Sequence, residues 1–168
     1  MSDTFDLAEF RRACSLFATG VAVVTTRFGE TFAGMTINSF ASVSLEPPLV
    51  LWCLKDKARS RDIFEGAGRF AINILAAEQL DDAKHFARNT LEAFEGGEPM
   101  IVSPRGLPLL PGALAHLECE TRHVFDGGDH RIMIGEVVAL SARPGVPLVF
   151  FQGRLTAGFP ELEPLVTP

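Results

Sequence analysis

Short polar side chains gather between residues 34 and 48, where two apolar runs flank them. These side chains belong to Thr36, Asn38, Ser39, Ser42 and Ser44. Small residues let a ligand approach the backbone closely and supply short hydrogen-bonding groups. The combination suits a flat ligand with polar edges that lies against a strand.

A basic cluster follows the second apolar run. Lys55, Lys57, Arg59 and Arg61 occupy seven positions of a chain whose net charge is −6. A helix is predicted to begin near Ser60, and its free N–H groups would make this a phosphate site. A solvated loop explains the same charges equally well. The sequence has no GxxxxGK[ST] loop and no GxGxxG after a strand, which places any such site outside the nucleotide-binding α/β folds.

The triplet Gly128-Asp129-His130 stands at a predicted hairpin. Residue chemistry alone makes Asp129 a turn former and His130 an exposed turn residue. The intervals between His116, His123 and His130 are odd, so neighbouring rings fall on opposite faces of a regular strand. This spacing argues against a metal site, and no GxSxG nucleophile motif is present.

The cysteines stand far apart and form no CxxC pair. They are Cys14, Cys53 and Cys119. Each falls within an apolar pattern, so we expect all of them to be reduced, buried, small hydrophobic residues.

Composition indicates one globular domain that spans residues 1–168. Hydrophobic residues make up 47% of the chain and charged residues 21%, and the net charge of −6 argues against nucleic acid or an anionic membrane as a partner. No apolar run approaches the roughly 20 residues of a membrane helix. The acidic start of the chain lacks the pattern of a signal peptide, so a cytoplasmic location is expected.

Hydrophobic periodicity predicts many short strands and few helices. An opening amphipathic helix follows Asp6 and ends before Gly20, and two more helices cover Ser60 to Gly66 and Glu78 to Arg88. Strands are predicted at 21–26, 31–36, 39–45, 49–54, 70–75, 113–125, 131–140 and 146–151, with a long loop at 95–112. Hairpin turns between them favour a mostly antiparallel barrel with peripheral helices.

The segments 34–48 and 49–55, with the later Gly128-Asp129-His130, resemble the flavin reductase family. The resemblance runs from Phe10 to Gly158 and implies a mostly β fold, an antiparallel Greek-key split β-barrel with peripheral α-helices. It also implies an NAD(P)H:flavin oxidoreductase that uses FMN, or alternatively FAD, with NADH or NADPH as co-substrate. A homodimer that supplies reduced flavin to a separate monooxygenase follows from the same resemblance.

The family resemblance also assigns roles to residues. The isoalloxazine is expected along Thr36, Ile37, Asn38 and Ser39. The ribityl chain and phosphate are expected at Cys53, Leu54, Ala58, Arg59 and Ser60, with Phe86, Ala87 and Arg88 brought to the flavin by a helix end. The nicotinamide is expected at Asp129 and His130, whereas Arg154 either reaches this site or is an ordinary exposed arginine. No catalytic side chain is implied, because the flavin carries the hydride chemistry.

Two other functions remain open on the sequence. The chain could be a split-barrel module that holds flavin or haem without turnover, although no convincing axial histidine is visible. It could also be a flavin-dependent oxidase of a small substrate, similar to the pyridoxamine-phosphate oxidases.

Overall fold

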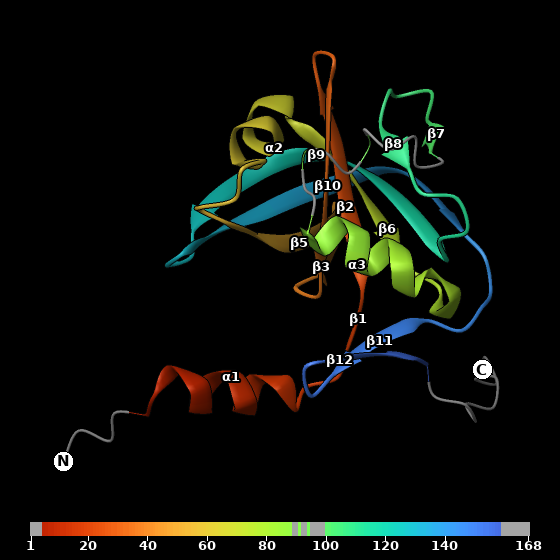
Figure 1. Cartoon of the computed structure of the whole chain (residues 1–168). Coiled ribbons are helices and arrows are strands. Elements are labelled where there is room, and N and C mark those ends of the chain that lie inside the picture. Colours follow the sequence, from red (N-terminus) through yellow and green to blue (C-terminus); the bar gives the residue numbers. More distant parts are fainter. Residues whose placement is uncertain (1–4, 89–90, 92–93, 95–99, 159–168) are drawn as a thin grey trace.

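A seven-stranded antiparallel sheet forms the body of the protein, in the order β3-β2-β6-β9-β10-β5-β4 (Figure 1). The computed structural model describes residues 5–88, 91, 94 and 100–158. The strands are β2 (Ala22–Phe28), β3 (Thr31–Ile37), β4 (Ala41–Leu45), β5 (Pro48–Lys55), β6 (Arg69–Ile74), β9 (Ala115–Asp126) and β10 (His130–Ala142). The predicted mostly antiparallel architecture is confirmed.

The sheet curls because its two edges are consecutive in sequence. Strands β3 and β4 lie at opposite ends of the strand order, yet only Asn38, Ser39 and Phe40 connect them. So short a connection brings the two edges together at one end of the sheet. The Ser39 hydroxyl accepts a hydrogen bond from the Cys53 N–H at 3.0 Å and ties this connection to β5. We call residues 38–40 the edge connection.

Aromatic side chains fill the interior of the curled sheet. The Trp52 ring meets Phe64 and Phe70 edge-on, with centroid distances of 5.0 and 5.7 Å. All of these rings are fully buried, and edge-to-face contact is a favourable arrangement for aromatic pairs. This core gives the strands that carry the site a rigid support.

Two helices pack on the sheet. Helix α2 (Arg61–Ala67) delivers Phe64 to the core and is capped at its C-terminus by Gly68, whose φ of 63° is left-handed. The predicted end at Gly66 is one residue before the last helical residue, Ala67. The 3₁₀ turn η1 (Ala77–Gln79) leads into α3 (Leu80–Arg88), which buries Ala83 and Phe86. A Cβ added at Gly34 would lie 2.6 Å from the Phe86 ring, so glycine at this position lets α3 approach β3.

A second, smaller sheet contains one strand that was predicted, at 146–151, and short strands that were not. β1 (Thr19–Gly20), β11 (Leu148–Phe151) and β12 (Arg154–Ala157) form a three-stranded sheet below the main one (Figure 1). β7 (Ile101–Val102) and β8 (Pro108–Leu109) form a small hairpin inside the predicted loop. The 95–99 part of that loop lies outside the described residues.

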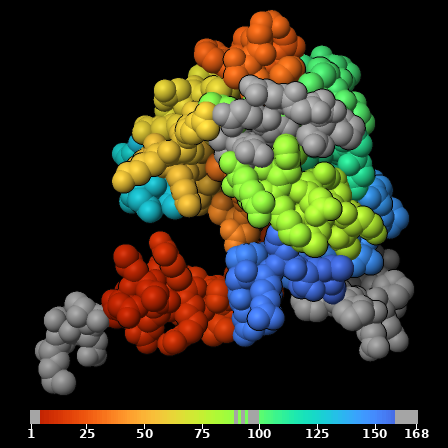
Figure 2. Space-filling view, viewed as in Figure 1, coloured from red at the N-terminus to blue at the C-terminus, as the bar shows by residue number. Residues whose placement is uncertain are grey.

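Helix α1 (Leu7–Ser15) forms as predicted, with the Asp6 carboxylate accepting a hydrogen bond from the Glu9 N–H at 2.7 Å. No residue of the helix is buried, because α1 projects beside β12 away from the main body (Figures 1 and 2). The prediction that Cys14 is buried is therefore wrong: Cys14 is exposed, whereas Cys53 is half-buried and Cys119 buried. No helix in the described part of the chain could span a membrane.

Candidate functional site

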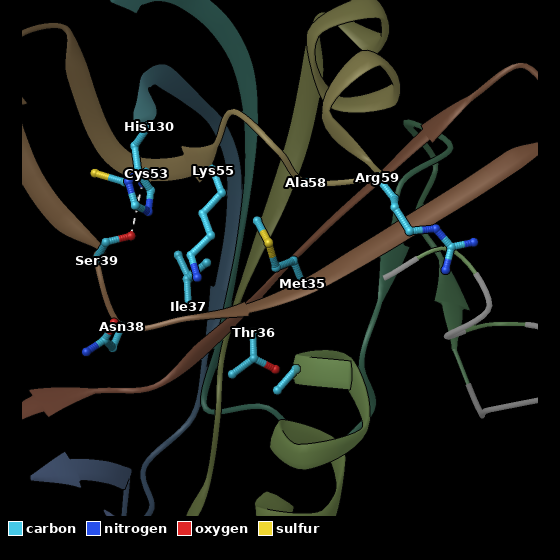
Figure 3. Close-up of a pocket in the computed structure, with 11 residues that line it drawn as sticks. Met35, Thr36, Ile37, Asn38, Ser39, Cys53, Lys55, Ala58, Arg59 and His130 are labelled. Carbon is cyan, nitrogen blue, oxygen red and sulfur yellow. Dashed lines mark hydrogen bonds between the residues drawn. The ribbon is translucent and has the colours of Figure 1, made fainter. Parts of the chain in front are cut away.

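A cavity of about 460 Å³ opens where the edge connection meets β5 and β10 (Figure 3). We call it the central cavity. Its lining comprises Met35, Thr36, Ile37, Asn38, Ser39, Cys53, Lys55, Ala58, Arg59, Ala87 and His130. These residues come from separate stretches of chain that the curled sheet brings together. Its volume lies in the range of about 300–1,000 Å³ that is usual for small-molecule sites.

Strand pairing explains how β5 and β10 reach the same cavity. His130 opens β10 and stands opposite Lys55, the last residue of β5, in the antiparallel register. Successive side chains of a strand alternate between faces, so Cys53 and Lys55 share one face of β5. The turn through Gly128, with a φ of 81°, brings the chain back so that His130 falls at this position.

Some predicted site residues do not line the central cavity, and strand alternation explains this for Leu54. Leu54 points to the opposite face of β5 from Cys53 and is fully buried in the core. Phe86 is likewise buried, against Gly34, while the neighbouring Ala87 reaches the cavity. Ser60 is buried beside the lining residue Arg59, and its hydroxyl has no hydrogen-bond partner among the described residues.

A second cavity of about 360 Å³ adjoins the first, and we call it the α3 cavity. Its lining comprises Val21, Thr36, Ile37, Asn38, Ala83, Lys84, Ala87, Arg88, Phe150 and Leu155. The predicted site residue Arg88 therefore lies in this cavity and not in the central one. The Thr36 hydroxyl donates to the Ala83 carbonyl at 2.7 Å and fixes the wall between the two cavities to α3.

The Asp129 carboxylate holds His130 from outside the central cavity. Asp129 is exposed, and its Oδ1 accepts a hydrogen bond from His130 Nδ1 at 2.7 Å. This bond, together with the charge of His130, holds the pKa of the Asp129 carboxyl below its ordinary value. Of this predicted pair, only His130 lines the cavity. Arg154 is exposed on β12 and lines neither the central nor the α3 cavity.

Sequence reasoning did not name Met35, and it named Lys55 only as a member of the basic cluster and not among the assigned flavin-site residues. Both could have been found by the period of two, because Met35 stands two residues before Ile37 and Lys55 two residues after Cys53. The lining therefore carries the cationic side chains of Lys55 and Arg59 near small and polar groups. Among the described residues, no three His, Cys, Asp or Glu side chains come close enough to hold a metal ion.

The residues present fit a phosphorylated flavin. The cavity has the volume for such a ligand, the two cations suit a phosphate, and the buried Ser60 hydroxyl has an unused donor next to Arg59. The N–H and C=O groups of the edge connection lie at the end of β3, where a flat ring with polar edges can reach them.

Comparisons with known proteins agree with this geometry. Residues 14–158 match the family described as flavin reductase like domain. The chain is 44% identical over 145 residues to the FMN reductase (NADH) SmoA of Agrobacterium fabrum, covering 86% of this chain and 82% of SmoA. It is 38% identical over 164 residues to the reductase subunit HsaB of a flavin-dependent monooxygenase of Mycobacterium tuberculosis, covering 96% of this chain and 87% of HsaB.

A solved structure extends the similarity to three dimensions. The NADH:FAD oxidoreductase SgcE6 of Streptomyces globisporus, in complex with NAD and FAD fragments, superposes with a TM-score of 0.85 at 36% identity. The match covers 96% of both chains. These matches confirm the resemblance stated from the sequence, and the chain belongs to the flavin reductase family.

Proposed function

We propose that this protein is an NAD(P)H:flavin oxidoreductase whose single domain reduces FMN, or alternatively FAD, for a separate monooxygenase. One observation carries the proposal. In a member of the flavin reductase family, a single cavity gathers the Thr36–Ser39 segment, the cations Lys55 and Arg59, and His130. Relatives are FMN and FAD reductases that use NADH, and one is the reductase subunit of a monooxygenase.

Different parts of the cavity receive different parts of the flavin. The isoalloxazine lies along Thr36–Ser39, where backbone groups and the Asn38 amide meet its polar edge. The ribityl chain and phosphate follow Cys53, Ala58 and Arg59, because a guanidinium forms strong paired hydrogen bonds with phosphate oxygens. Arg59 and Lys55 also lower the cost of placing an anion near a protein of net charge −6.

His130 positions the nicotinamide. When bound, the flavin accepts the hydride itself, so the reaction needs no protein acid or base. The contribution of the chain is to hold the two rings in contact, and this can lower the barrier substantially. His130 suits the role because the bond to Asp129 fixes its ring at the cavity rim.

A homodimer is part of the proposal. Leu7 in helix α1 and Phe17 just after the helix are 72% and 76% exposed. A further cavity of about 550 Å³ lies between α1 and Asn38, Ser39 and Phe150. A second copy of the chain packed there would bury the apolar face of α1 beside the flavin segment. Light scattering is expected to give a dimer at micromolar concentration, and a stable monomer would contradict this part.

A cytoplasmic location completes the proposal, because reduced nicotinamide nucleotides are cytoplasmic co-substrates.

The decisive experiment measures NADH and NADPH oxidation by the purified protein with FMN and with FAD. Turnover with a flavin supports the proposed function. Tight flavin binding with no oxidation of either nucleotide would instead make the chain a binding module.

A further inference from the structure

Lys55 is a cation of the central cavity whose charge is not committed to another group of the protein. The neighbouring Asp56 carboxylate pairs with Arg61 at 3.8 Å. Across the strand pair, the Asp129 carboxylate binds His130 at 2.7 Å. Lys55 itself forms no ion pair with any residue that the structure describes, so its ammonium is available to a ligand.

Strand geometry directs this ammonium into the cavity. Lys55 ends β5, shares one strand face with Cys53 and stands opposite His130 in the antiparallel register. Figure 3 shows its side chain extending into the central cavity toward Ile37. An exposed lysine is usually a solvated charge, but this one lines the same cavity as the segment 36–39. A ligand that fills the cavity therefore meets the ammonium.

The two cations of the lining lie in different parts of the central cavity. In Figure 3, Met35 stands between Lys55 and Arg59. Arg59 adjoins the buried Ser60 hydroxyl, which has no partner among the described residues and suits the flavin phosphate. Lys55 lies instead opposite His130, where the proposed function brings the nicotinamide against the isoalloxazine. The lining therefore offers one cation to the phosphate and a separate cation to the ring system.

The charge of the flavin ring differs between substrate and product. Hydride transfer moves one hydrogen nucleus with two electrons from the nicotinamide to the flavin, so the neutral ring gains a negative charge until a proton follows. A cation held close to that ring stabilises the reduced form and leaves the oxidised form nearly unaffected. The phosphate charge, by contrast, is the same in both forms.

We propose that Lys55 makes the protein discriminate between the redox states of its flavin, so that it binds the reduced flavin about tenfold more tightly than the oxidised one. The inference rests on the proposed function, which supplies the hydride. Such a preference keeps the product on the reductase until a monooxygenase takes it, instead of releasing it to react with dissolved oxygen. Arg59 adds affinity without this preference, because it meets the phosphate.

The test is anaerobic titration of the purified full chain with oxidised FMN and with FMN reduced by dithionite. Wild type is expected to bind the reduced form about tenfold more tightly. Lys55→Met should remove that preference and leave the affinity for oxidised FMN within about twofold, whereas Lys55→Arg keeps the charge and should keep the preference. The matched control, Lys57→Met, removes the same charge from an exposed position of the same loop outside the cavity and should bind both forms like wild type.

The midpoint potential of bound FMN gives a second readout, which a purely structural role of Lys55 would not move. A tenfold loss of affinity for the reduced form lowers the potential of this two-electron couple by about 30 mV. Arg59→Ala should weaken both forms equally and leave the potential of the bound FMN unchanged, because the phosphate is the same in both.

Equal binding of the two redox forms by wild type overturns the proposal, as does an unchanged preference in Lys55→Met. Equal weakening of both forms in Lys55→Met also overturns it and indicates that the ammonium binds the phosphate. In that case riboflavin, which lacks the phosphate, should bind the variant as it binds wild type. Because dithionite reduces the flavin, none of these measurements needs turnover. Oxidation of NADH by wild type with FMN, measured separately, shows whether the proposed function itself holds.

Discussion

Asp129 Oδ1 and His130 Nδ1 lie 2.7 Å apart at the turn that joins β9 to β10. Asp129 is almost fully exposed, whereas the His130 side chain is 31% exposed and lines the central cavity. The carboxylate therefore acts on the site only through the imidazole, whose orientation it fixes. With Nδ1 engaged, Nε2 is the ring nitrogen left to meet a ligand.

His130→Ala is expected to lower kcat/KM for NADH tenfold to a hundredfold, because a positioning contact is lost at the reacting rings. Flavin affinity should stay nearly unchanged. Asp129→Ala keeps the imidazole and should have a milder effect. Steady-state kinetics with NADH, paired with flavin titration, check both variants. Wild-type kinetics in folded His130→Ala protein would show that His130 does not position the nicotinamide and is an ordinary hairpin residue.

The Asp129–His130 contact should also be visible in a pH titration. In the folded protein the His130 contact lowers the pKa of Asp129, so its small contribution to stability is present above the unfolded pKa, about 4, and is lost as pH falls through the folded value. In His130→Ala the largest cause of the shift disappears. Carbon NMR of the Asp129 carboxyl should then show a higher pKa, and an unchanged titration would exclude the contact in solution.

Arg59→Ala is expected to weaken FMN affinity by about 1.5–3 kcal/mol, the usual range for a charged hydrogen bond. Lys57→Ala is the matched control, because Lys57 is exposed in the same loop and does not line the cavity. Fluorescence titration of FMN measures both. Equal FMN affinities in the two variants would indicate that the segment around Arg59 is a solvated loop that does not bind the phosphate.

Ser60→Ala separates a structural role from a binding role. The buried hydroxyl has no partner among the described residues and does not cap α2, so its removal should barely change the flavin-free unfolding free energy. If the hydroxyl serves the flavin phosphate, FMN affinity should fall in the same variant. Chemical denaturation without flavin and FMN titration give the two readouts. A large stability loss with unchanged affinity would make Ser60 purely structural.

The three cysteines should differ sharply in thiol reactivity. Cys14, which is exposed in a single copy of the chain, should react with a disulfide reagent at once when the protein is diluted to the monomer, half-buried Cys53 more slowly and with protection by flavin, and Cys119 only on unfolding. Burial raises the pKa of Cys119 from 9.0 to about 12, so stability should decline as pH rises through that interval. Thiol counting on wild type and on Cys14→Ser and Cys53→Ser variants checks the order. Flavin-independent labelling of Cys53 would argue against its place in the cofactor site.

Gly34→Ala is expected to destabilise the fold by about 1–3 kcal/mol, the usual cost of overpacking. Its Cβ would meet the buried Phe86 ring at 2.6 Å and push α3 from β3. Gly20→Ala is the matched control, since a Cβ there meets nothing within 4 Å. Urea denaturation compares the two variants. Equal stabilities would show that α3 adjusts freely.

Local patterns were enough for the long strands and the helices. β-branched runs identified β2 and β6, and turn residues identified the hairpin before His130. The two-residue strands β1, β7 and β8 were not predicted because so few residues show no periodicity. β1 forms only by pairing with the distant β11, whereas β7 and β8 pair with each other. A register shift between β9 and β10 near Gly135 likewise interrupts the predicted alternation. This shift depends on the pairing of two strands and cannot be read from either one.

The site could be foreseen as segments but not as a cavity. Family resemblance named Arg59 and His130, which lie far apart in sequence, and the curled sheet brings them to one lining. Lys55 was named in the basic cluster but not assigned to the flavin site, because that cluster was considered as a charged group and not by strand alternation. The prediction that Cys14 is buried was wrong for a different reason. The helical periodicity around Cys14 was correct, but burial of that helix face needs a packing partner that a single copy of the chain does not supply.

The edge connection limits how the protein can vary. Asn38, Ser39 and Phe40 carry the chain from one edge of the sheet to the other, and two of them also line the central cavity. An insertion there would loosen the curl and displace the lining of the central cavity together, so neither property can change alone. The turn at Gly29 has open space around it. It neither joins the two edges of the sheet nor lines the central cavity. Loop grafts and length changes should therefore be tolerated at the β2–β3 tip and rejected at the edge connection.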